Sequence, residues 1–98
     1  MSDLAAENPI EFINKWYLGK CDGNWEHEFG VEIATIDNPG WLIKLTGENA
    51  KEVLSFELER ADDDWIHTNS SATSFTGHGG SGNLNELLLL AVKWLQSN

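Results

Sequence analysis

The sequence predicts an α+β domain: an N-terminal helix, a four-stranded antiparallel meander sheet and a C-terminal helix, with both helices packed on one face of the sheet. Three observations predict it. Apolar residues recur at helical spacing near both ends of the chain, they alternate with polar residues in between, and turn-forming residues separate the alternating stretches. The chain has 98 residues and shows no repeat or linker, so residues 1–98 are one predicted domain.

The first helix is predicted to begin at Pro9. Asn8 is a favourable N-cap, Pro9 suits the first helical position because its missing N–H costs nothing there, and Glu11 stands where a capping box places an acidic residue. One face of this helix then carries the apolar side chains of Ile10, Ile13, Trp16 and Tyr17.

Residues 31–47 are predicted to form a β-hairpin. In VEIATI (31–36), Val31, Ile33 and Thr35 share one face of a strand, because side chains alternate between the two faces. DNPG then breaks the strand, and Pro39 and Gly40 suit the central positions of a type II turn. WLIKLTG (41–47) returns as the partner strand.

Two further strands are predicted after this hairpin. VLSFELER (53–60) places Leu54, Phe56 and Leu58 on the inner face and polar residues on the outer face. ADDD forms the next turn. In the fourth strand, DWIHTNSS (64–71), Trp65 and His67 point to one face, and the residues that point to the other face are Ile66 and Thr68.

The second helix is predicted over LNELLLLAVKWLQ (84–96). Asn83 with Glu86 three residues later is a helix N-terminus signature. Apolar residues extend well beyond a single stripe of this helix, from Leu84 to Leu95. The helix must therefore be covered on more than one side.

The glycine-rich stretch GHGGSGN (77–83) is predicted as a loop before this helix. Such loops often bind phosphate at a helix N-terminus. However, this one contains no Lys or Arg and matches neither phosphate-binding glycine motif. We therefore favour a tight connection in which the glycines permit positive φ angles and Asn83 caps the helix.

Composition restricts the possible partners. Sixteen acidic residues against six basic ones give a net charge of −10. Nucleic acids and anionic membranes are bound through Lys and Arg, so we expect neither as a partner, and the acidic surface favours a basic protein. No apolar run is long enough to span a bilayer and the acidic start does not resemble a signal peptide, which predicts a cytoplasmic protein. The single cysteine, Cys21, excludes an internal disulfide.

The stretch CDGNWEHEFG (21–30) concentrates groups with chemical potential. The evidence for a metal site in this stretch is weak. If WEHEF were extended, His27 would point away from Glu26 and Glu28. A further ligand would then have to come from elsewhere in the chain, from His67 or His78. As a nucleophile Cys21 is also weak, because it lies at a helix C-terminus among carboxylates. We favour a structural corner with a turn at residues 22–23 and Trp25 as its anchor, and predict no catalytic residue, no metal and no cofactor.

The pattern W-Y-x-x-x-C-D-G-x-W-E-H-x-x-G-V-x-I-x-T-x-D-N-P-G-W, carried by Trp16 to Trp41, resembles the immunity protein 53 family. An acidic strand, a W-I segment and G-x-G-G before a leucine-rich helix extend the resemblance from about Ile10 to Leu95. Members of this family are small proteins assigned to bacterial polymorphic toxin systems. The resemblance supplies no catalytic residues.

The resemblance implies an immunity protein that binds a cognate toxin domain and neutralises it without catalysis, as a monomer or weak homodimer. An acidic inhibitor suits a basic toxin, and tryptophans exposed at the rim would anchor the interface. We expect the contact surface to combine the corner with the acidic turn. Its residues are Asp22, Trp25, Glu26, His27, Glu28, Asp62, Asp63 and Asp64.

Two alternatives remain at this stage. One is a small thiol-dependent enzyme or sulfur carrier that uses Cys21 with His27. The other is a general protein-interaction or homo-oligomeric module. Replacement of Cys21 by serine separates the first alternative from an immunity protein, because only a thiol-dependent activity needs the sulfur atom.

Overall fold

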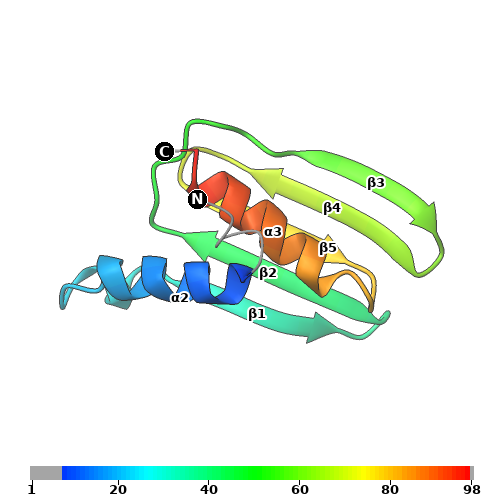
Figure 1. Ribbon diagram of the computed structural model, residues 1–98, viewed down its shortest axis with the longest axis horizontal. Helices are drawn as coiled ribbons and strands as arrows, with labels where there is room; N and C mark the ends of the chain where they lie inside the picture. The colour runs from blue at the N-terminus through cyan, green and yellow to red at the C-terminus, as the bar shows by residue number, and fades with distance from the viewer. Residues whose placement is uncertain (1–7, 98) are drawn as a thin grey trace.

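The computed structural model describes residues 8–97, which form an α+β fold with two helices and a five-stranded antiparallel sheet (Figure 1). The elements in chain order are helix α2 (Pro9–Lys20), a 3-10 turn (Trp25–His27), strands β1 (Val31–Ile36), β2 (Gly40–Thr46), β3 (Phe56–Ala61), β4 (Asp64–Ser70) and β5 (Ser74–Gly79), and helix α3 (Leu84–Leu95). Neither helix is long and apolar enough to cross a membrane.

The predicted four-stranded meander is wrong, because a fifth strand lies in the middle of the sheet. The strand order is β1-β2-β5-β4-β3. After β2 the chain passes to the far edge, forms the hairpin of β3 and β4, and returns as β5 between β2 and β4. The sequence SFTGHG of β5 was hidden from pattern analysis because glycine is depleted in strands and supplies no side chain to alternate.

The glycines of residues 77–82 were predicted to adopt positive φ angles, and this is wrong. Gly77 and Gly79 are instead needed for close packing. Within residues 8–97, only Gly23 and Gly47 have positive φ. A Cβ atom at Gly77 or Gly79 would lie 3.0 Å from a methyl group of Leu87. The missing side chains therefore let α3 approach the centre of the sheet.

The turn between β1 and β2 also differs from the prediction. Residues 37–39 form the turn and Gly40 is already the first residue of β2, paired with Ile36. A type II turn needs positive φ at its third position, which Gly40 lacks. Glycine is needed there because a Cβ atom would collide with the carbonyl oxygen of Gly79.

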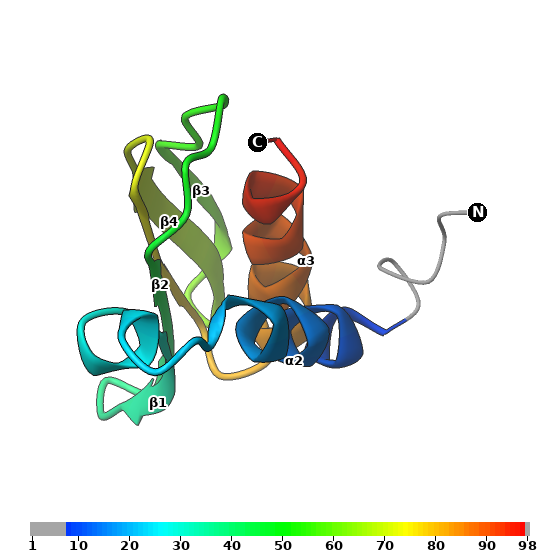
Figure 2. The ribbon, with the colours of Figure 1, turned by 90° about the vertical axis from the view of Figure 1, so that its left-hand side faces the viewer.

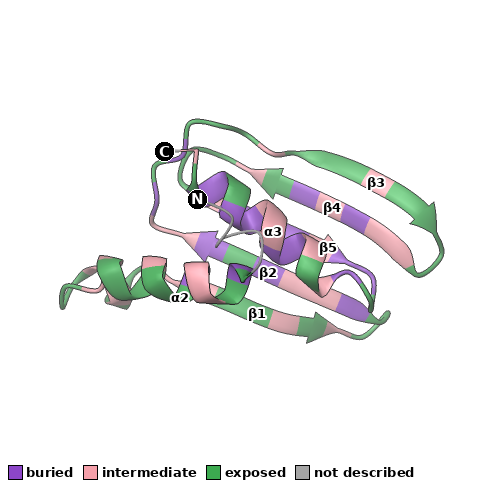
Figure 3. Cartoon of the chain, in the orientation of Figure 1, coloured by how far each residue is buried: buried purple, intermediate pink, exposed green. Residues whose placement is uncertain are grey.

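The core lies between α3 and the sheet. Figure 3 shows buried positions along α3 and the central strands, whereas β3 is mostly exposed. Trp94 of α3 packs 6.0 Å from the ring of Phe75 and donates its indole N–H to the carbonyl of Ser71. The largest fully buried side chains are Trp94, Phe75, Ile43, Leu45, Ile66 and Leu87.

Helix α2 begins as predicted. The side chain of Asn8 accepts the backbone N–H of Glu11 at 3.1 Å, and Pro9 occupies the first turn. The helix packs against α3 and runs alongside β1, where residues 10–17 and 29–33 line a common groove. Its predicted apolar face is only partly used: Ile13 is buried, whereas Ile10 is 50% exposed.

Helix α3 begins after Asn83, but the Asn83 side chain does not cap the helix as predicted. Its amide Nδ2 donates instead to Oδ1 of Asp64 at 2.9 Å. Asn83 is 7% exposed. The amide nitrogen thus holds the β3–β4 turn on the start of α3. Oδ1, the atom that would accept an N–H group of the first turn, is buried and has no hydrogen-bond partner among residues 8–97.

Candidate functional site

The sheet has one face that α3 covers and one that it does not. Gly77 and Gly79 face Leu87 of α3, so His78 between them points to the opposite side. In Figure 2, α3 stands on one side of the sheet, and no helix of residues 8–97 covers the middle of the other side. We call this side of β1–β5 the open face.

A row of cross-strand partners crosses the centre of the open face. His67 of β4 and His78 of β5 are direct partners. Glu57 of β3 lies opposite His67, and Leu42 of β2 lies opposite His78. Directly opposed residues in neighbouring strands point to the same face, so this row presents a carboxylate, two imidazoles and an apolar group on the open face.

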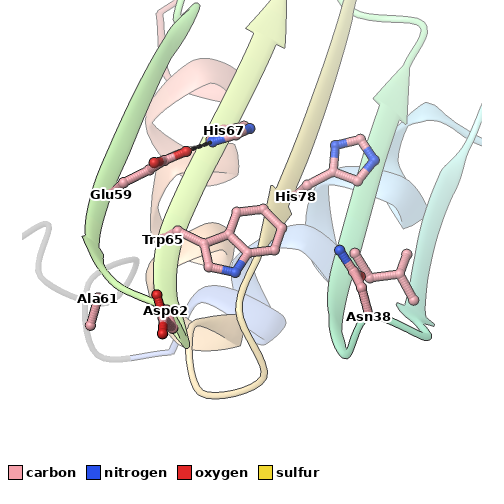
Figure 4. Close-up of a pocket in the computed structure, with 8 residues that line it drawn as sticks. Asn38, Glu59, Ala61, Asp62, Trp65, His67 and His78 are labelled. Carbon is pink, nitrogen blue, oxygen red and sulfur yellow. Dashed lines mark hydrogen bonds and ion pairs between the residues drawn. The ribbon is translucent and has the colours of Figure 1, made fainter.

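A pocket of about 470 Å³ opens beside this row, toward the β3–β4 turn (Figure 4). A second hollow of about 580 Å³ shares His67 and His78 with it. The open face is therefore hollowed on both sides of the histidine pair. The first pocket is lined by Ile36, Asn38, Glu59, Ala61, Asp62, Trp65, His67 and His78.

Trp65, His67 and Glu59 are held together in this pocket. The rings of Trp65 and His67 meet edge to face, with centroids 5.1 Å apart. Nε2 of His67 lies 3.1 Å from Oε2 of Glu59, whose side chain is 68% exposed. Trp65 and His67 lie on one face of β4, and Ile66 and Thr68 lie on the other, as the alternation in DWIHTNSS predicted.

Trp65 differs from the other four tryptophans in the hydrogen bonding of its indole N–H. The indoles of Trp16, Trp25, Trp41 and Trp94 each donate at 3.0 Å to an oxygen atom of the chain. The indole N–H of Trp65 has no such acceptor among residues 8–97. Trp65 is half-buried in the wall of a pocket and keeps a donor available for a partner.

The predicted site at residues 21–30 is a corner held by its own acidic side chains. Oδ1 of Asp22 accepts the N–H groups of Asn24 and Trp25, both at 2.9 Å. The carboxylate of Glu26 accepts the N–H groups of Asp22 at 3.0 Å and Gly23 at 2.8 Å. WEHEF does not adopt the extended conformation considered for a metal site, because these bonds stabilise a turn that continues into a 3-10 helix.

These hydrogen bonds also set the charge state of the corner. The N–H groups of Trp25 and Asn24 lower the pKa of Asp22. The pKa of Glu26 is lowered by its own N–H and by those of Asp22 and Gly23. Both carboxylates are therefore committed to the turn as anions.

Trp25 anchors this corner, as the structural reading of the sequence predicted. Its ring packs edge to face against Trp16 and Tyr17, with centroids 5.5 Å and 5.7 Å away, and its N–H binds the carbonyl of Gly47. His27 and Glu28 are exposed. They are the two corner residues, among those predicted to contact a partner, whose side chains face solvent and form no hydrogen bond or ion pair with residues 8–97.

The acidic turn, residues 62–64, also contributes one residue, Asp64, to an ion pair within the fold. Arg60 contacts Asp64 through Nε and Nη2, at 3.0 and 2.7 Å, and Glu86 through Nη1 and Nη2, at 3.2 and 2.7 Å. Hydrogen bonds to Glu86 and then Asp64 raise the pKa of Arg60, and the bond from Arg60 lowers that of Asp64. Asp62 and Asp63 are exposed at the tip.

The structure does not bring the two predicted groups together. In Figure 1 the corner after α2 and the β3–β4 turn lie at opposite ends of the molecule, whose longest dimension is 42 Å. Asp62 lines the pocket of the open face, whereas no corner residue does. The acidic turn therefore adjoins the histidine pair of the open face, whereas Glu28 of the corner lines a different hollow, together with Glu32 and Lys44.

Groups that could support chemistry are sparse in the part of the chain that the structure describes. No cluster of three or more His, Cys, Asp or Glu side chains among residues 8–97 is placed to hold a metal ion. Cys21 is half-buried at the C-terminal end of α2, as predicted, and the pKa of Tyr17 is raised by a hydrogen bond with its side chain.

Comparison with known proteins adds the family. The model of the Immunity protein 53 family matches residues 10–96. The chain belongs to the immunity protein 53 family. The searches of curated proteins and of solved structures returned no match. The resemblance predicted from residues 16–41 is thus confirmed, and this immunity protein 53 domain extends from α2 through α3.

Sequence reasoning missed the open face as a site. The alternation in DWIHTNSS already placed Trp65 and His67 together, but nothing showed that their side of the sheet is uncovered. His78 was assigned to a loop, and Glu59 was treated only as one polar residue of a strand. Recognition of SFTGHG as a strand would have aligned His78 with His67.

Proposed function

We propose that this immunity protein 53 domain binds a cognate toxin domain and neutralises it by covering the toxin, without catalysis. The observation that carries the proposal is the family match over residues 10–96, which includes all five strands, helix α3 and all of helix α2 except Pro9. A one-domain protein whose sheet has an uncovered, hollowed face is suited to binding.

Charge supports a basic toxin as the partner. The net charge of −10 attracts a cationic surface at a distance and accelerates association. Toxin domains that act on nucleic acids are generally basic, because they must bind phosphate. We infer that the protein acts in the cytoplasm. We also infer that it is a monomer or a weak homodimer, because two copies with this charge repel each other.

We further propose that the acidic turn with Asp62 and Asp63 takes part in the contact. Both carboxylates are exposed and adjoin the open face. In the corner, His27 and Glu28 remain a second candidate contact, whereas the principal role of Asp22, Trp25 and Glu26 is to hold the turn. Asp64 acts mainly through its bonds to Arg60 and Asn83.

The test is protection of a bacterium. The toxin domain encoded beside this gene is expressed from an inducible promoter, with and without the immunity protein, and survivors are counted. The proposal predicts growth only when the protein is present, and no rescue from an unrelated toxin. Lack of rescue despite folded, abundant protein would contradict the immunity function.

A further inference from the structure

We propose that the pocket at the β3–β4 end of the open face binds a cationic side chain of the partner, an arginine or a lysine, between Trp65, Glu59 and Asp62. The inference that this partner is a toxin domain rests on the proposed function. The cation-binding property itself rests on the pocket geometry and can be tested alone.

The pocket offers the two kinds of group that hold such a side chain. Trp65 forms an aromatic wall, and cations bind favourably over the face of an indole ring. Carboxylates of Glu59 and Asp62 line the same pocket, as Figure 4 shows. A guanidinium group donates up to five hydrogen bonds, so it can pair with a carboxylate while its plane stacks on the ring.

Trp65 is the tryptophan that the fold leaves available. The other four use their indole N–H groups to fasten segments of the chain, whereas that of Trp65 has no acceptor within residues 8–97. Tryptophan is enriched among residues that dominate binding energy at interfaces. Its position at the inner wall of a pocket, with an acidic rim, matches that role.

Charge selects the occupant. A second copy of the chain would bring another net charge of −10 against Glu57, Glu59 and Asp62, which disfavours self-association through this face. Among residues 8–97, no Lys or Arg lines the pocket, so an anionic ligand would find no permanent positive charge there. A basic segment of another protein is the occupant that these charges favour.

The first experiment measures binding of the adjacent gene's toxin domain, inactivated by mutation, to four proteins: wild type, Glu59→Lys, Trp65→Leu and Glu52→Lys. The two lysine variants form a matched pair, since each changes the net charge from −10 to −8 at an exposed site. Long-range attraction therefore falls equally in both. Circular dichroism and thermal unfolding confirm that each variant is folded.

The proposal predicts that Glu59→Lys weakens binding about 10-fold or more beyond Glu52→Lys, and that Trp65→Leu weakens it about 30-fold. Equal effects of the two lysine variants, or a larger effect of Glu52→Lys, would overturn it. If Trp65→Leu does not fold, the Glu59→Lys variant still decides the question. The Glu59 side chain is 68% exposed, so its replacement leaves the core intact.

A second experiment separates this inference from the proposed function. The peptide acetyl-Gly-Arg-Arg-Gly-amide is titrated into the protein, and the indole N–H signals are followed by NMR, with the Gln-Gln peptide as control. The Trp65 signal should shift with the arginine peptide, and the shift should be lost in Glu59→Lys. If the wild type binds no toxin but this shift occurs, the immunity function fails and the cation site stands; if the arginine peptide leaves the Trp65 signal unchanged, the cation site fails.

Discussion

The indole N–H of Trp16 donates a 3.0 Å hydrogen bond to the carboxylate of Glu48, 32 positions further along the chain. Glu48 is 7% exposed and also accepts Nζ of Lys20 at 2.9 Å and the N–H of Asn49 at 3.0 Å. One buried carboxylate thus fastens α2 to the segment after β2. Sequence patterning did not identify it, because Glu48 lies outside every predicted element.

Replacement of Glu48 by glutamine should therefore destabilise the protein. The amide can still accept from Trp16, but its interaction with the Lys20 cation is lost. We expect a loss of about 1–3 kcal/mol in the free energy of unfolding, measured by urea denaturation. The matched control is Glu52→Gln, an exposed site in the same loop, which should change stability by less than about 0.5 kcal/mol.

The same carboxylate should make stability depend on pH. Burial alone would raise the pKa of Glu48, but hydrogen bonds from Lys20, Asn49 and Trp16 lower it below the usual value of 4.5. A lowered folded-state pKa adds stability above the unfolded pKa, and this is lost as the pH falls through the folded value. The stability difference between wild type and Glu48→Gln should therefore narrow below about pH 4.5. A difference that stays constant down to pH 3 would contradict this role.

Alanine at Gly79 should disturb the packing of α3. Its Cβ would lie 3.0 Å from Leu87 and 3.2 Å from both Asn83 and the carbonyl oxygen of Trp65. Overpacking of this kind costs about 1–3 kcal/mol, seen as a lower urea midpoint. Gly82→Ala is the control, because nothing lies within 4 Å of its added methyl group. Equal stability of the two variants would show that close approach is not what requires glycine in β5.

Removal of Arg60 should loosen the β3–β4 turn from α3 in a salt-dependent way. Arg60 is bound by Asp64 and Glu86, all three partly exposed. Arg60→Gln should lower the thermal midpoint at low ionic strength, and the difference should shrink in 0.5 M salt because exposed pairs are screened. Lys51→Gln, which removes an exposed cation without such a pair among the described residues, serves as the control.

Cys21→Ser should leave protection against the toxin unchanged. Our account assigns no chemistry to the thiol, and serine keeps the size and a hydrogen-bonding group at the end of α2. Survival with the variant is counted beside wild type at matched expression. Loss of protection with a folded variant would favour the thiol-dependent alternative.

The sequence predicted those elements whose signals are local. The cap formed by Asn8 and Pro9 placed the start of α2 correctly, and period-two alternation located β1 to β4. β5 was missed because Gly77 and Gly79 are required by packing against Leu87 of α3, and contact between two elements leaves no alternation within the strand itself. Strand order likewise depends on long-range pairing that no local pattern encodes.

The candidate site shows the same division. A turn at Asp22 and Gly23 with Trp25 as its anchor could be predicted, because those residue types act on their neighbours. The open face could not, since it is defined by what α3 leaves uncovered. The predicted contact surface was therefore drawn from stretches of the sequence that are dense in charge. In the structure, the carboxylates of two of these residues, Asp22 and Glu26, accept backbone N–H groups of the corner itself.

Calorimetry of the inactivated toxin domain with this protein, at low and at physiological salt, tests the central claim most directly. We predict a tight one-to-one complex whose affinity falls as salt rises, because a chain with a net charge of −10 meets a basic partner. Absence of binding at both salt concentrations, with both proteins folded, would contradict the account.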